Sequence, residues 1–115
     1  MWILTPDGFY SIVQKPGESD LCIRARVGDD LDRLRERYLP TLTETTETRA
    51  GDYRYRAWAT HEAVADALAA IVRDLHYDNF KNEVSRHDRE RAHAYHDVWF
   101  VLGRLQPGGP YGYGE

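Results

Sequence analysis

Residues 52–75 read DYRYRAWATHEAVADALAAIVRDL, and this stretch decides the fold. Its first part, 52–59, alternates between two kinds of side chain, which predicts a β-strand because successive strand residues point to opposite faces. Its second part repeats apolar residues at a helical spacing, namely Val64, Leu68, Ile71, Val72 and Leu75. Thr60, just before them, suits the N-cap of a helix. A strand followed at once by an amphipathic helix predicts a sheet packed against helices.

The strand predicted over 52–59 has two chemically different faces. One face carries Tyr53, Tyr55, Ala57 and Ala59, and the other carries Arg54, Arg56 and Trp58. We expect the face with the alanines to meet the helices and the arginines to face water. The alternative is that both tyrosines are exposed, which would bury the tryptophan against the helices.

Three further strands or strand-like runs precede this stretch. Residues 2–5 and 9–14 flank Pro6-Asp7-Gly8, whose residue types suit a tight turn, so we expect a hairpin. A polar segment rich in Pro and Gly leads into 21–27, where Leu21, Ile23, Ala25 and Val27 alternate with Cys22, Arg24 and Arg26. This predicts a third strand with one apolar face.

Helical patterns fill most of the remaining chain. One helix opens at Gly28-Asp29-Asp30, where an Asp can cap free N–H groups, and ends before Pro40. We expect 41–51 to be a loop, with a weak strand as the alternative. A short helix over 80–85 and a last helix over 89–105 follow.

The predicted fold is therefore α+β: a two-layer sandwich of a four-stranded, mainly antiparallel sheet in the order β-β-β-α-β-α-α, with helices on one face. We expect a single domain over 1–106. The tail 107–115, rich in Gly, Pro and Tyr, is predicted to be disordered because it has little to bury.

Composition narrows the functional classes. The one cysteine, Cys22, allows no internal disulfide and no cysteine-based zinc cage, which favours a reducing compartment. The first residues resemble neither a signal peptide nor a membrane span, so we expect a cytoplasmic protein without membrane contact. The formal net charge of -4 argues against attraction to nucleic acid over the whole surface, so binding of phosphate would need a local basic patch.

Strand alternation predicts such a patch. Arg24 and Arg26 would share the open face of the sheet with Arg54, Arg56 and Trp58. Guanidinium groups bind phosphate or carboxylate bidentately, and the tryptophan could stack on a base or hold an apolar anchor of a partner. The alternative is that these are ordinary solvent-facing side chains whose charges pair with nearby acids.

Two weaker candidates lie further on. Asn79 and Lys81, in the segment between two helices, could contact a ligand at the rim of a cleft, whereas the structural alternative makes Asp78 or Asn79 the cap of the next helix. His93 and His96 would lie on one side of the last helix, but no complete set of metal ligands accompanies them, so we predict no metal site and no cofactor. No nucleophile motif or phosphate-binding glycine loop is present in the sequence.

Several segments carry a resemblance to a known family. They are 9–13 (FYSIV), 23–26 (IRAR), 52–57 (DYRYRA), 77–81 (YDNFK) and 95–99 (YHDVW). Together they resemble a family of small uncharacterised bacterial proteins over most of the chain to Leu105. The resemblance implies a compact domain and no particular activity.

These observations favour a non-enzymatic binding or adaptor domain. Its Arg and aromatic sheet face would engage a protein or a small anionic ligand. One alternative is binding of single-stranded nucleic acid or a nucleotide by the same face, and another is a small enzyme with a dispersed site. Association into a homodimer through exposed aromatic residues is a further option.

Overall fold

Residues 1–109 are described by a computed structural model of the chain. By their internal contacts the residues fall into two compact units, Met1–His76 and Tyr77–Glu115. The boundary between them lies inside the range that the sequence predicts as one domain, 1–106. Of the tail predicted to be disordered, residues 110–115 lie outside the described part of the chain.

The first unit contains a five-stranded sheet in the order β1-β2-β3-β5-β4. Its strands are β1 (Trp2–Thr5), β2 (Gly8–Val13), β3 (Leu21–Ala25), β4 (Thr46–Glu47) and β5 (Tyr55–Ala59). All neighbouring pairs are antiparallel. The α+β prediction with an antiparallel sheet is confirmed. The difference is one extra strand, the two-residue β4, which lies in the segment expected to be a loop or a weak strand.

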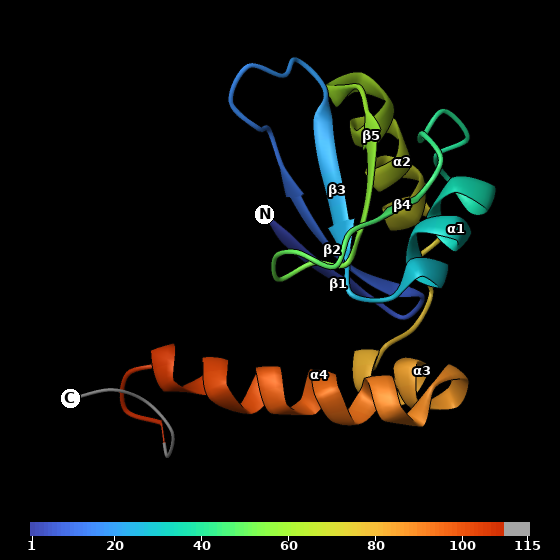
Figure 1. The fold of residues 1–115 in the computed structure, drawn as a ribbon. Helices are drawn as coiled ribbons and strands as arrows, with labels where there is room; N and C mark the ends of the chain where they lie inside the picture. Colours follow the sequence, from blue (N-terminus) through green and yellow to red (C-terminus); the bar gives the residue numbers. More distant parts are fainter. Residues whose placement is uncertain (110–115) are drawn as a thin grey trace. The chain divides into compact units, whose positions relative to one another are not determined.

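Two helices of this unit, α1 (Gly28–Arg37) and α2 (His61–Arg73), pack against one face of the sheet (Figure 1). Alternate strand residues and the apolar stripes of both helices form one core, made of Tyr10, Ile12, Ile23, Ala25, Leu31, Leu34, Leu39, Leu42, Ala57, Ala59, Val64 and Ala67. Thr60 caps α2, because its side chain accepts a hydrogen bond from the Ala63 N–H. The apolar residues of β3 and β5 therefore face the helices, as the alternation in the sequence predicts.

The second unit is built from α3 (Phe80–His87), α4 (Arg89–Leu102) and a short 3-10 turn, η1 (Gly103–Leu105). Asn79 caps α3 and Asp88 caps α4 through their side chains. The Phe80 ring stacks on the Tyr95 ring at 5.7 Å between centroids. Among the described residues, no helix is both long and apolar enough to cross a bilayer.

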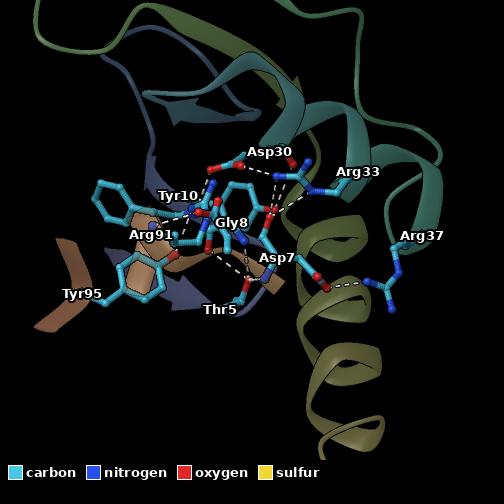
Figure 2. Close-up of polar contacts among 11 residues, drawn as sticks. Thr5, Asp7, Gly8, Tyr10, Asp30, Arg33, Arg37, Arg91 and Tyr95 are labelled. Carbon is cyan, nitrogen blue, oxygen red and sulfur yellow. Dashed lines mark hydrogen bonds and ion pairs between the residues drawn. The ribbon is translucent and has the colours of Figure 1, made fainter. Parts of the chain in front are cut away.

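A buried carboxylate joins α1 to the β1–β2 hairpin (Figure 2). Asp30 is 1% exposed, and its Oδ2 accepts a hydrogen bond from the Phe9 N–H at 3.1 Å. Its Oδ1 is 2.6 Å from Nη2 of Arg33, which also donates to the carbonyl of Asp7 at 2.9 Å. The Tyr10 hydroxyl donates to the Asp30 carbonyl at 2.9 Å. One polar network thus holds the helix to hairpin residues that lie twenty or more positions away along the chain.

This network replaces the helix cap that the sequence suggests. The N-cap residue of α1 is Val27, and no side chain caps it. The expectation that an Asp at the start of the helix caps the free N–H groups is therefore wrong for Asp30. Its carboxylate is used across the fold instead of within its own helix.

Replacing Asp30 by Ala should lower the free energy of unfolding by about 1–3 kcal/mol. The change leaves the Phe9 N–H without its acceptor, whereas Arg33 is exposed enough to be hydrated. Urea denaturation followed by circular dichroism measures the effect. The control is Asp29→Ala, an exposed acid in the same helical turn, which should change stability by about 0.5 kcal/mol or less. Equal effects of the two changes would contradict the role of the network.

Gly8→Ala should also destabilise the first unit, by about 1–3 kcal/mol, because the hairpin approaches its neighbours too closely for a side chain. A Cβ at this position would lie 2.4 Å from the Tyr10 hydroxyl oxygen and 3.1 Å from Asp30 Cβ. Thermal unfolding measures the change. Gly109→Ala serves as the control, since its nearest contact would be 3.7 Å away, and its melting temperature should match that of the unchanged chain.

Candidate functional site

The sheet face opposite the apolar core carries an unusual row of side chains. Ser11 of β2 is paired with Arg24 of β3, and Arg24 is paired in turn with Arg56 of β5. Cys22 and Trp58 form the neighbouring pair on the same face. We call this side of the sheet, made of Ser11, Cys22, Arg24, Arg56 and Trp58, the arginine face; Ser11 and Cys22 are buried on it, and the other three side chains are partly exposed. Its members come from three strands whose register the core residues determine.

Arg24 and Arg56 lie directly opposite each other with little internal compensation. Nη2 of Arg24 donates to the Ser11 hydroxyl at 2.7 Å. The Nε atoms of both arginines are buried and have no hydrogen-bond partner within residues 1–109. Neither arginine forms an ion pair with a carboxylate in this described part of the chain. Two like charges in direct register are destabilising unless something neutralises them.

Arg54 differs from Arg56, although the sequence places both on one face. Strand β5 begins at Tyr55, so the alternation does not include residue 54. Nε of Arg54 donates to Glu47 of β4 at 2.8 Å, and both side chains are about half exposed. The charge of Arg54 is therefore already paired on the surface, whereas that of Arg56 is not.

Tyr53 lies on the arginine face rather than with the alanines. Its ring centroid is 4.5 Å from the guanidinium carbon of Arg24 and 4.8 Å from that of Arg26, and it also contacts the Phe9 ring. The prediction that Tyr53 shares the face of Tyr55 and the alanines is wrong, because residue 53 precedes the regular strand. The ring is 3% exposed, so it packs against the two guanidinium groups and has no free face on which a ligand could stack.

Trp58 lies on the arginine face, as the alternation predicts, and a hydrogen bond holds it there. Its Nε1–H donates to Oε1 of Glu18, in the loop between β2 and β3, at 2.9 Å. The side chain is partly exposed. Because Tyr55 packs against the core, the alternative in which Trp58 is buried under the helices is wrong. Trp58 is thus an oriented aromatic group beside Arg56.

The charges of the arginine face act on the buried thiol of Cys22. Burial raises the pKa of the Cys22 thiol, while the positive charges of Arg56, Lys15 and Arg24 oppose that rise. Of the acids, Glu18 acts in the opposite direction. The thiol is therefore buried on a side of the sheet that carries positive charge.

Asn79 and Lys81 have structural roles in the second unit. The Asn79 side chain accepts a hydrogen bond from the Asn82 N–H at 2.9 Å, so it caps α3 as the structural alternative predicts. The ammonium nitrogen of Lys81 lies 4.3 Å from the centroid of the Trp99 ring. His96 also packs on Trp99. Across residues 1–109, no three His, Cys, Asp or Glu side chains come together as metal ligands would.

Sequence reasoning missed the residues that complete the arginine face. Ser11 is recognisable in retrospect as the one polar residue inside an otherwise apolar strand. Lys15 and Glu18 lie in a loop without any periodic pattern, so nothing in the sequence links them to Cys22 or Trp58. The close approach of Gly51 to Arg56, whose Nη2 would lie 3.3 Å from a Cβ at position 51, is equally invisible.

Alkylation of Cys22 by iodoacetamide should show a pH profile displaced to higher pH than that of the same thiol in the urea-unfolded chain. Burial raises the pKa of the folded thiol, so a smaller fraction is ionised at a given pH, and only the thiolate reacts. Mass spectrometry of the modified fraction against time measures the rate. Equal rates of modification in water and in urea at the same pH would contradict the burial of this thiol.

No family model, curated protein or solved structure gives a significant match to this chain. The resemblance to small uncharacterised bacterial proteins therefore stays a prediction.

Proposed function

We propose that the first unit is a non-enzymatic cytoplasmic binding module whose arginine face takes up an anionic group of a protein partner or of a small ligand. One observation carries the proposal. Arg24 and Arg56 are direct partners across β3 and β5, and neither has a carboxylate partner within residues 1–109. A bound anion would neutralise the positive charges of these two arginines.

The chemistry of the face supports binding rather than proton transfer. Guanidinium groups stay protonated throughout the physiological range, so they hold anions but do not act as acids or bases. Hydrogen bonds to charged groups contribute about 1.5–3 kcal/mol each, more than the roughly 0–1 kcal/mol of an exposed ion pair such as that of Arg54 with Glu47. Partly buried arginines without a carboxylate partner therefore offer more to a ligand than the paired arginine does.

Binding of single-stranded nucleic acid is the second candidate, and exposed tryptophans favour it. Trp58 is partly exposed next to Arg56. Trp2, paired with Ser11 and so on the same face, is 66% exposed and touches Phe9 edge-on. Aromatic rings beside cations are the usual platform for unpaired bases.

Reversing both charges, Arg24→Glu with Arg56→Glu, should abolish anion binding and leave the fold intact. The probes are inorganic phosphate, a hexaglutamate peptide and a ten-residue oligothymidylate, each titrated against the full chain with tryptophan fluorescence as the readout. The control is Arg54→Glu, which removes a cation that Glu47 already pairs and should retain binding. Circular dichroism checks that each variant folds.

The proposal fails if none of the three probes binds, or if the double reversal leaves the affinity of the bound probe unchanged. Salt then separates the two candidates. An oligonucleotide complex should weaken steeply between 50 and 200 mM salt because released counterions oppose it, whereas an interface centred on an aromatic anchor should change little.

A further inference from the structure

The donors that the two arginines can offer are restricted by what already surrounds them. One of the two terminal nitrogens of Arg24, Nη2, already donates a hydrogen bond to the Ser11 hydroxyl. The Nε atoms of Arg24 and Arg56 are both buried. What remains for a ligand is the terminal nitrogens, contributed by two side chains that leave the sheet next to each other.

This restriction discriminates between kinds of anion. A carboxylate is planar and is held best by the two parallel donors of one guanidinium, either Nε with Nη2 or the two Nη atoms. The first pair is not accessible in either arginine, and in Arg24 the second pair is shared with Ser11, so the two Nη atoms of Arg56 are the one parallel pair left for a carboxylate. An anion with three oxygens pointing in different directions can instead accept from both arginines at once.

Charge favours the same kind of anion. Arg24 and Arg56 are direct partners across β3 and β5, and neither forms an ion pair with a carboxylate within residues 1–109. Their two positive charges therefore lie next to each other without internal neutralisation. A group carrying two negative charges neutralises two guanidinium groups, whereas one carboxylate neutralises one.

We infer that the group bound between Arg24 and Arg56 is a phosphate, which both arginines hold through their terminal nitrogens. The inference rests on the proposed function and specifies its ligand. The phosphate belongs to a nucleotide or to a phosphorylated protein segment. In either case the oriented ring of Trp58 lies beside the phosphate, where the organic part of the ligand packs.

The test compares inorganic phosphate with malonate, a dicarboxylate whose net charge at pH 7.5 is similar to that of phosphate. Each is titrated against the isotope-labelled full chain, and the readout is the NMR signal of the arginine Nε–H groups, because buried groups exchange slowly with water. We expect phosphate to bind about tenfold or more tightly than malonate. Arg56→Gln should weaken phosphate binding about 10- to 100-fold, since it removes charged donors but no internal hydrogen bond among the described residues.

Two control variants make the result specific. Arg54→Gln removes the same charge from the paired arginine beside the site and should leave the affinity unchanged within about twofold. Arg56→Lys keeps the charge but loses the forked donors, and it should recover only part of the affinity. Loss of binding in Arg56→Gln with an unchanged melting temperature excludes a failure to fold.

The outcomes separate the inference from the function on which it rests. Malonate binding as tightly as phosphate, with the loss confined to Arg56→Gln, overturns the phosphate inference and leaves the anion-binding module standing. Binding of neither anion, or binding that Arg56→Gln does not alter, overturns both. Tighter binding of phosphate that depends on Arg56 supports both.

A last comparison identifies the source of the phosphate, with a nucleoside monophosphate, ribose 5-phosphate and a phosphoserine peptide as probes. Tighter binding of the nucleoside monophosphate than of ribose 5-phosphate assigns a nucleotide, because the base is the difference between them. The tightest binding by the peptide assigns a phosphorylated protein. Failure of all three to bind as well as inorganic phosphate overturns the inference of a bound phosphate ester.

Discussion

Asp30 places a carboxylate in the interior of the first unit, and the arrangement of that unit depends on how this charge is satisfied. A buried carboxylate is costly unless donors surround it. Here the donors come from the Phe9 backbone and from Arg33, which in turn holds the carbonyl of Asp7. Meeting that requirement ties α1 to the β1–β2 hairpin and so commits the helix to one face of the sheet. The opposite face is left to other side chains.

That commitment explains why cations gather where they do. Once α1 and α2 cover the apolar side of β3 and β5, the period of the strand sends Arg24 and Arg56 to the other side. The antiparallel register then sets them opposite each other rather than staggered. Neither arginine can turn toward the core, because a shift of one residue in the register would exchange the core side chains of its strand for those of the arginine face. The repulsion of the two charges is therefore built into the sheet.

Local patterns in the sequence were enough to predict the elements, the fold class and the side on which Arg24, Arg56 and Trp58 lie. They failed where a residue is positioned by a partner far along the chain. Tyr53 appeared to continue the alternation of 55–59, yet the strand starts later and the ring is drawn under two arginines. Arg54 and Arg56 look equivalent in the sequence, and only the position of Glu47 on the short β4 separates them. Asp30 resembles a helix cap by its position, and only the folded hairpin reveals a different use.

The backbone conformation of Gly51 and its closeness to Arg56 restrict which residues can replace it. The residue has a φ of +93°, and a Cβ there would lie 3.3 Å from Nη2 of Arg56. Both its backbone conformation and its neighbour therefore disfavour a side chain. In the evolution of related chains, a glycine at this place and an arginine five residues later should be inherited or lost together, so the pair would serve as a marker of which descendants have kept the same surface.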